Sequence, residues 1–482
     1  MELLFESRVE VLRTSGRLRF VQGRAEVLPE PVLRPDTPAD ATGANIYGSV
    51  LRDGGVYRMW YQAWPGDWDG RDVGTVGYAE SDDGLTWHKP ALGLVVDGPT
   101  GNNLCDLGLH SPAVFIDPTA PPEARYRATG FTGPGRSGGH EGLARDGYYT
   151  AHSADGLHWI LDGQAPAWPG GDVITSVYHL ARGEALVALK YTQRAGGRPR
   201  RAVWNATLRS GAGPAALPSP PAAALVPDAL DDIGAAARSH HGGDYYGMGM
   251  MPACRATVGF LWHFRHDLPL TPGRDHGVYG VVDVGLVYQP GPGEAWLHVH
   301  GRPDFLTHGE PAWAAGGIYT SANVVQAGDE QRLYLGGARL SHGWYLDADW
   351  SRNPGRLAAM RGAGVMAIGL ARWRRDRLFG FRADPEGTLD LDLGPIEQPS
   401  SLRLNYAADA RGSVRAELLG REGYGLVDAV PLTGDALEGE AAWHGGHMLP
   451  ITGDEQLTVR LHIDEATVYA YDVRPLSGGI GG

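Results

Sequence analysis

The sequence predicts an all-β protein, a five-bladed β-propeller followed by a small β-sandwich. Three observations support this prediction. A short motif recurs along the chain, long amphipathic helices are nearly absent, and glycine and proline are abundant (Gly 71, Pro 34) without a collagen-like period. At 482 residues the chain is also too long for one ordinary core, which favours two or more domains.

The recurring motif has the Asp-box-like form SxDGxxW. Its first copy ends at Trp87, its second at Trp159, and a degenerate copy, YQPGPGEAW, ends at Trp296. The interval from Trp159 to Trp296 is close to twice the first interval, which leaves room for one unit around 203–208 that has lost the motif. A last unit ends near 368–381. The spacing therefore predicts five units.

Within each unit the pattern is strand, turn, strand. GVYRMWYQAW follows the turn sequence RDGG, ALVALKYTQR follows ARGE, and QRLYLGGARL follows AGDE. Five repeats of roughly four strands are typical of a β-propeller, which protects its sheet edges by radial closure. The best candidate for a short helix is DALDDIGAAARSHH, residues 228–241.

The pattern changes after about residue 395, where apolar and polar residues alternate over longer runs. One predicted strand face consists of Leu457, Val459, Leu461 and Ile463. We therefore expect three segments: a propeller at 1–395, an antiparallel β-sandwich at 396–476 and a flexible tail at 477–482.

Charge and composition exclude several classes of protein. The net charge is −14 and no basic run occurs, so neither nucleic acid nor an anionic membrane is an expected partner. Two cysteines give no disulfide framework and no Cys-rich metal site. The N-terminus has charges inside its apolar run, unlike a signal peptide, and no apolar stretch is long enough to span a membrane. These features predict a cytoplasmic protein, and nothing indicates a cofactor.

The acids of the motif are interpreted as structural. In SxDGxxW the aspartate bonds the backbone that follows it, the glycine adopts a positive φ, and the tryptophan packs between blades. Asp83 and Asp155 would then lie at outer turns. A catalytic group is expected instead on an innermost strand, facing the propeller axis.

The motifs carry a resemblance to a known family. YRMWYQA followed by GYAESDDGLTWHKPALGL resembles the first blade of proteins related to glycosyl hydrolase families 32, 43 and 68. NNLCDLGLHSPAVFIDPTAPPEARYRATG is similar to their second blade, and DYYGMGM, VGFLW and GDEQRLYLGGARLSHG are similar to later blades. SLRLNYAADARGSVRAELL is similar to the sandwich that follows them. The resemblance covers nearly the whole chain and is more specific for fold than for activity.

The resemblance implies glycosidic-bond chemistry in a funnel along the propeller axis. Such enzymes use one carboxylate as nucleophile or base and another as general acid. Acids near the starts of inner strands are the catalytic candidates, and they are Asp40, Asp172, Asp244 and Glu310. The first inner strand, ATGANIYGSV, has no acid, and Cys254 or Arg255 stands where the resemblance implies a glutamate. The acids are therefore displaced from the family pattern.

Histidines and tyrosines near the same strand ends are the candidates for binding substrate. They are Tyr47, His110, His241, Tyr246, Tyr319 and His342. Three of the histidines can converge on the axis, where imidazoles hydrogen-bond sugar hydroxyls. The pair His298 and His300 is the one HxH spacing, and no metal site is predicted.

Three functions remain open. The first is a glycoside hydrolase or transglycosidase acting on a small carbohydrate, with furanosides among the candidate substrates, by carboxylate acid/base chemistry. The second is a diverged propeller enzyme that catalyses a non-hydrolytic tailoring or cyclising step, which the displaced acids favour. The third is a non-catalytic carbohydrate-binding propeller. In each, the partner is a small molecule or carbohydrate, and fold alone does not choose among them.

Overall fold

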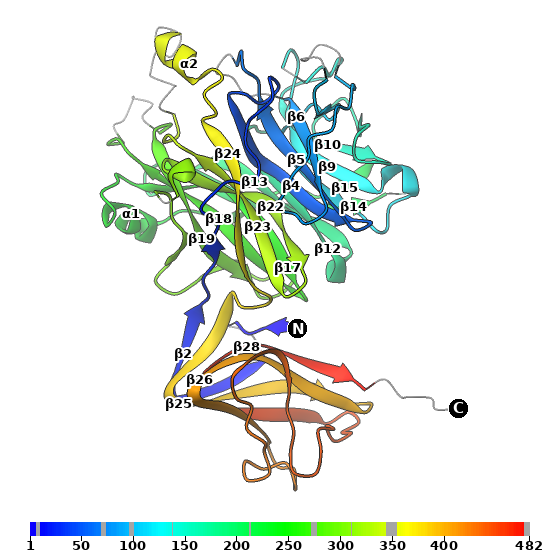
Figure 1. Cartoon of the computed structure of the whole chain (residues 1–482), viewed down its shortest axis with the longest axis vertical. Coiled ribbons are helices and arrows are strands. Elements are labelled where there is room, and N and C mark those ends of the chain that lie inside the picture. Colours follow the sequence, from blue (N-terminus) through cyan, green and yellow to red (C-terminus); the bar gives the residue numbers. More distant parts are fainter. Residues whose placement is uncertain are drawn as a thin grey trace. The chain divides into compact units, whose positions relative to one another are not determined.

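The computed structural model describes every residue apart from 6–9, 69–73, 96–100, 137, 212–213, 271–276, 310, 344–353 and 477–482. The described chain is almost entirely β-structure (Figure 1). Its internal contacts divide it into two compact units. The smaller unit comprises 1–24, 326–331 and 373–482, and the larger unit comprises 25–325 and 332–372.

This division differs from the predicted boundary at residue 395. In the smaller unit, β2 (Val11–Gln22) pairs antiparallel with β25 (Phe379–Pro395), so the N-terminal strand belongs with the C-terminal segment. The pattern within a strand shows which face is buried, but not which distant strand is its partner. The predicted tail at 477–482 lies outside the described residues.

The described strands of the smaller unit pair into one six-stranded sheet. Its order is β2, β25, β28 (Gln456–Pro475), β26 (Ser400–Leu418) and β27 (Asp435–Glu440), and β1 (Glu2–Leu3) pairs with β28. The long strands contain register shifts, for example between Ala408 and Ser413 of β26. Such irregularities bend a strand, and both halves of β26 contribute to one core.

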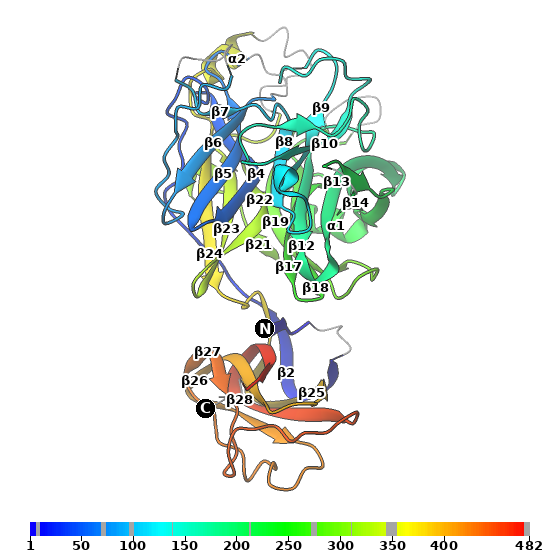
Figure 2. The ribbon, with the colours of Figure 1, turned by 90° about the vertical axis from the view of Figure 1, so that its right-hand side faces the viewer.

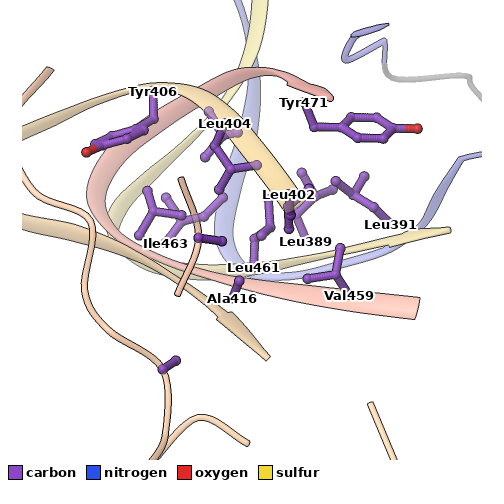
Figure 3. Close-up of a cluster of buried hydrophobic side chains, with 14 of the residues drawn as sticks. Leu389, Leu391, Leu402, Leu404, Tyr406, Ala416, Val459, Leu461, Ile463 and Tyr471 are labelled. Atoms are coloured by element: carbon purple, nitrogen blue, oxygen red, sulfur yellow. The ribbon is translucent and has the colours of Figure 1, made fainter. Parts of the chain in front are cut away.

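The predicted strand face Leu457, Val459, Leu461 and Ile463 lies entirely in that core. Figure 3 shows Leu461 and Ile463 of β28 beside Leu402 and Leu404 of β26. The four residues of the face are at most 1% exposed. The alternation read from the sequence is therefore confirmed for this strand.

The described strands of the larger unit form three sheets, of four, five and thirteen strands, and parallel bridges of Met250 to Asn323 and of Met366 to Gly43 join parts of the largest. Along the chain these strands can be taken as five successive groups. The first group is β4 (Gly43–Asp53), β5 (Val56–Trp64), β6 (Val76–Ser81) and β7 (Leu104–Cys105). The second is β8 (His110–Ile116), β9 (Tyr126–Thr132), β10 (Gly147–Ser153) and β11 (Ile160–Leu161). The third is β12 (Ile174–His179), β13 (Glu184–Ala195), β14 (Arg198–Ser210), β15 (Ala216–Pro218) and β16 (Ala222–Leu225).

The remaining two groups follow the same plan. The fourth is β17 (Gly243–Ala253), β18 (Ala256–His266), β19 (Gly280–Gln289), β20 (Leu297–His298) and β21 (Asp304–Leu306). The fifth is β22 (Gly317–Ala327), β23 (Glu330–Ala338) and β24 (Met366–Arg374), with the early strand β3 (Glu26–Val27) paired to β24. Strands of the first group lie side by side in both views (Figures 1 and 2).

The first strands of successive groups are neighbours. β8 contacts both β4 and β12, and β12 contacts β17. β17 meets β22 in a parallel bridge at Met250 and Asn323. The Asn323 amide then spans to β4, donating to Val50 O (2.7 Å) and accepting from Val50 N (3.3 Å). Side-chain hydrogen bonds therefore connect inner strands that a backbone ladder does not join.

The two SxDGxxW copies form the same turn. Asp83 Oδ1 accepts from the backbone N–H groups of Leu85 (2.7 Å) and Thr86 (2.8 Å), and Gly84 has φ +71°. Asp155 Oδ1 makes the equivalent bonds with the two residues that follow Gly156. Hydrogen bonds from the backbone of Thr86 and Leu85 lower the pKa of Asp83 to about 2. Both aspartates therefore act as turn residues.

Each motif also receives a hydrogen bond from another strand group. Tyr334 of β23 donates to Gly84 O (2.7 Å), and Trp60 of β5 donates to Gly156 O (2.7 Å). The motif glycines therefore connect the fifth group to the first and the first to the second. This role is structural, as the sequence pattern indicated.

Helices are short. α1 (Ala229–Ala236) confirms the predicted helix and is capped by Asp228 and Asp231 in a capping box. The other α-helix of the described chain is α2 (Pro354–Met360), and single 3₁₀ turns occur at Pro122–Ala124, Leu180–Arg182 and Ala312–Ala314. None of the described helices has the length and apolar character needed to cross a membrane.

Candidate active site

A cavity of about 230 Å³ lies in the larger unit. Its walls come from inner strands of several groups and from the segments that precede or follow them. One predicted catalytic residue and five predicted binding residues line it: Asp172, Tyr47, His110, Tyr246, Tyr319 and His342. The structure therefore brings together residues that the sequence spreads over some three hundred positions.

Asp172 directly precedes Val173 and β12, and its backbone is unusual. Its φ is +91°, in the left-handed region that residues other than glycine rarely adopt. Strained backbone of this kind is concentrated at functional sites. Next to it, Ser111 (φ +56°) donates from its hydroxyl to Ile174 O (3.0 Å), which connects β8 to β12. This link places His110 beside Asp172.

The Asp172 carboxylate contacts three side chains. It forms a hydrogen-bonded ion pair with Lys190, His110 Nε2 lies 3.4 Å from its Oδ1, and the Tyr246 hydroxyl lies 3.2 Å from its Oδ2. Burial disfavours the charged carboxylate, but the charge of Lys190 and the hydrogen bond from His110 outweigh it. The pKa of Asp172 is therefore held below its usual range, and the group is ionised near neutral pH.

Lys190 was not predicted from the sequence, although strand register explains its position. β12 and β13 pair with Ile174 opposite Leu189, so the next pair brings Lys190 to Val173. The backbone confirms this with a bond from Lys190 N to Val173 O (3.1 Å). A hairpin prediction with its register would have identified the lysine, because it stands one residue from Asp172 across the ladder.

Irregular pairing points three of the predicted binding residues into the cavity. The β17–β18 register shifts between Tyr245 and Gly247, which leaves Tyr246 as an extra residue. Similar shifts occur in β4 around Tyr47 and in β8 just after His110. A bulge re-aims a side chain that strict alternation would send to the other face. Tyr245 accordingly bonds outside the cavity, to Asp231, whereas Tyr246 lines it.

Tyr246 and His342 form a hydrogen-bonded pair. The Tyr246 oxygen lies 3.0 Å from His342 Nε2, and His342 Nδ1 donates to the carbonyl oxygen of Val278 (2.5 Å). Burial lowers the pKa of His342 to about 4. The imidazole is therefore neutral near pH 7 with its proton on Nδ1, so Nε2 is an acceptor. It shares the single hydroxyl proton of Tyr246 with Asp172 Oδ2, which lies 3.2 Å from the same oxygen.

Two cations lie against the Tyr246 ring. Lys190 Nζ is 4.1 Å from the ring centroid, and the Arg201 guanidinium carbon is 5.5 Å from it. Arg201 also lines the cavity and was not predicted from the sequence, because charged residues in the run RPRR give no sign of which one faces inward. Both cations therefore contact the face of the phenol ring as cation–π partners.

Aromatic rings build the surrounding wall. Tyr246 stacks on Phe264 with ring centroids 5.6 Å apart, and Tyr47 stacks on Trp262 at 5.7 Å. Tyr319 meets Tyr47 edge-on at 5.1 Å. These contacts fix the orientation of the hydroxyl-bearing rings, and such surfaces also accept the faces of sugar rings.

Two of the other predicted catalytic residues, Asp40 and Asp244, do not line this cavity. Asp40 is fully buried, accepts from the Tyr61 hydroxyl (2.8 Å) and pairs with Lys89 (2.6 Å). Asp244 is buried among Arg198, Arg200 and other basic groups. Neither carboxylate lines the cavity, although Asp244 Oδ2 lies 3.6 Å from Nη1 of Arg201, which does.

His241 is exposed and its backbone N–H donates to His266 O (2.8 Å), away from the cavity lining. Glu310 lies outside the described residues. In the part of the chain that the structure describes, no group of three or more His, Cys, Asp or Glu side chains is arranged to hold a metal ion. His298 of the HxH pair bonds the Tyr245 hydroxyl (3.2 Å).

No protein-family model matches the chain, and no curated protein matches it. Among solved structures it is similar to a glycoside hydrolase family 43 arabinoxylan arabinofuranohydrolase from Bacillus subtilis (TM-score 0.40, 10% identity, 92% of this chain and 99% of that chain). It is also similar to a family GH32 β-fructofuranosidase of Bombyx mori (0.40, 11%, 93% and 94%) and to a β-1,2-mannobiose phosphorylase from Listeria innocua (0.41, 10%, 73% and 97%). Families 32 and 43, which the sequence motifs resemble, therefore both occur among the solved structures similar to this chain.

Proposed function

We propose that the larger unit is a five-bladed β-propeller and that it is a glycosidase-like enzyme acting on a small carbohydrate in the cavity. The five strand groups and the contacts between their first strands support the propeller. The hydrogen bonds of Asn323 to Val50, which connect the fifth group to the first, support its closure.

The observation that carries the enzymatic proposal is the Tyr246–His342 pair beside an ionised carboxylate. A nucleophile within hydrogen-bond reach of a base, with the base oriented by a third group, is the arrangement that activates hydroxyl nucleophiles. Here the hydroxyl is that of Tyr246, the base is His342 Nε2, and the orienting group is Val278 O. Arg201 supplies positive charge beside the Tyr246 ring, whereas the charge of Lys190 is offset by Asp172.

In the proposed reaction the Tyr246 oxygen bonds to the anomeric carbon while the glycosidic bond breaks. The phenol proton passes to His342 Nε2 and from there to the departing oxygen. Water then attacks the anomeric carbon with Asp172 as its base, the bond to Tyr246 breaks, and the proton held by Asp172 returns to the phenolate. Before each step the sugar is held by the aromatic wall and by hydroxyl contacts with His110.

The predicted mechanism with two carboxylates finds less support. Among the described residues that line the cavity, Asp172 is the single carboxylate, whereas glycosidases of that type place two on either side of the bond. The ion pair of Asp172 with Lys190 also favours a second candidate function, a carbohydrate-binding propeller without turnover, because a paired carboxylate serves as a hydrogen-bond acceptor for hydroxyls.

A panel of aryl furanosides and pyranosides tests the proposal. The wild-type protein should release the aryl group from at least one glycoside, and Tyr246→Phe should reduce kcat by roughly a hundredfold or more, since it removes the nucleophile. Release that Tyr246→Phe leaves unchanged would contradict the role of Tyr246. No release by the wild type, together with a sugar that raises Tm, would establish the binding function instead.

A further inference from the structure

The guanidinium of Arg201 has an unusual environment for a mostly buried arginine. Its side chain is 17% exposed and lines the cavity. It stacks on Phe264 with its central carbon 4.6 Å from the ring centroid. No hydrogen bond from this guanidinium to any described residue is found, although the group offers five N–H donors. Burying a charged group without hydrogen bonds is unfavourable unless a ligand satisfies them.

The acid nearest to Arg201 does not satisfy it. Asp244 Oδ2 lies 3.6 Å from Arg201 Nη1, beyond hydrogen-bond distance. The other carboxylate oxygen of Asp244 is already bonded by Arg198 at 2.9 Å, and Arg200 Nε lies 3.4 Å from it. Of these arginines, Arg201 is the one that lines the cavity. Its charge is therefore the least compensated of the three.

The charged side chains around Arg201 also leave an excess of positive charge. Three arginines, 198, 200 and 201, share two carboxylates, Asp232 and Asp244. Lys190 and Asp172 offset each other as an ion pair. The described cluster thus has one positive charge in excess, at the wall of a cavity in a chain whose net charge is −14. The local positive charge attracts anions to this wall, although the net negative charge of the chain repels them elsewhere.

We propose that the substrate carries an anionic group, the carboxylate of an acidic sugar, and that Arg201 binds this group. A guanidinium presents paired donors that match a carboxylate in two parallel hydrogen bonds. The stacking on Phe264 fixes the plane of the fork. The inference rests on the proposed carbohydrate site, and it adds the charge of the ligand and the residue that recognises it.

Ligand-induced shifts in Tm and isothermal titration with matched sugars test this proposal without requiring turnover. D-glucuronate and D-galacturonate are compared with D-glucose and D-galactose, and glucose 6-phosphate and inorganic phosphate are added as separate arms. At least one acidic sugar should bind about tenfold or more tightly than its neutral counterpart, and this preference should decrease as salt is raised. Equal binding of acidic and neutral sugars would overturn the proposal, as would tighter binding of inorganic phosphate alone than of any acidic sugar.

Arginine variants test whether Arg201 is the residue that recognises the acidic sugar. Arg201→Met should abolish the preference for the acidic sugar, and Arg201→Lys, which keeps the charge, should retain part of it. Arg198→Met is the matched control, because Arg198 pairs with the same Asp244 but does not line the cavity. An equal loss in Arg198→Met would contradict recognition by Arg201.

The two proposals can fail separately. Binding of an acidic sugar that depends on Arg201, with no glycoside cleaved, would refute the enzymatic proposal and support this one. Cleavage of neutral glycosides with no preference for charge would do the reverse.

Discussion

Removing Lys190 tests whether the Asp172 ion pair stabilises the site. The side chains of the pair are 11% and 29% exposed for Lys190 and Asp172. Removing one partner of a fully buried pair costs about 3–5 kcal/mol, and partial exposure of the carboxylate reduces this through solvent screening. We therefore expect Lys190→Met to lower the free energy of unfolding by about 2–3 kcal/mol at pH 7.

The double variant Lys190→Met/Asp172→Asn should recover part of this loss, because no unpaired charge remains. Its cost should be smaller than the sum of the two single costs by about 1–2 kcal/mol. Urea unfolding followed by tryptophan fluorescence measures all four proteins.

The pH dependence of the single variant provides a second measurement. Without Lys190, the strongest charge that lowers the pKa of Asp172 is gone while burial still raises it. The carboxylate should therefore take up a proton more readily as pH falls, which relieves part of the loss. The gap between Lys190→Met and the wild type should therefore shrink between pH 7 and pH 4. Single costs that add to within about 0.5 kcal/mol would refute the ion pair as a stabilising contact.

Three further changes have definite expected outcomes. The pKa of His342 is about 4 in the folded protein and near 6.5 in the unfolded chain, so unfolding takes up a proton between these values. The free energy of unfolding should therefore fall by about 3 kcal/mol as pH drops from 6.5 to 4. Urea unfolding of His342→Gln should show a smaller decrease with pH, and the same decrease as in the wild type would contradict the buried neutral imidazole. Asp83→Ala removes the turn hydrogen bonds and should cost about 1 kcal/mol in thermal unfolding, with unchanged sugar binding; a loss of binding would argue against a purely structural motif. Gly336→Ala would place a methyl group 2.0 Å from Asn45 Oδ1 and should lower the free energy of unfolding by more than about 2 kcal/mol. Gly234→Ala in α1, where the added methyl group meets open space, should raise the free energy of unfolding by up to about 1 kcal/mol. Equal Tm changes in the two variants would contradict the packing at Gly336.

The repeats and strand faces could be predicted from sequence because they depend on local pattern. The SxDGxxW copies mark equivalent turns in two groups, and the alternating residues 457–463 form a buried face as expected. Helix α1 lies within residues 228–241, the best candidate for a short helix in the sequence. Each of these features is determined by residues a few positions apart.

The site was predicted only in part, because its geometry depends on pairing and irregularity. Tyr246 enters the cavity through a bulge that alternation does not reveal, and Lys190 reaches Asp172 through the register of a hairpin. Asp40 and Asp244 have the expected residue type at the expected strand ends, yet neither lines the cavity. Asp40 pairs with Lys89, and Asp244 pairs with arginines of which one, Arg201, lines the cavity. Sequence position near an inner strand therefore did not determine which acid faces the cavity.

The most direct test of the proposed site compares two carboxylates with similar neighbours. Asp172 contacts Lys190 and Tyr246, and Asp40 contacts Lys89 and Tyr61, but only Asp172 lines the cavity. With the best glycoside of the panel, Asp172→Asn should reduce kcat/KM by about a hundredfold or more, as expected for loss of a base, and Asp40→Asn should change it by less than about threefold. Equal losses in the two variants, or full activity in Asp172→Asn, would contradict the assignment of this cavity as the active site.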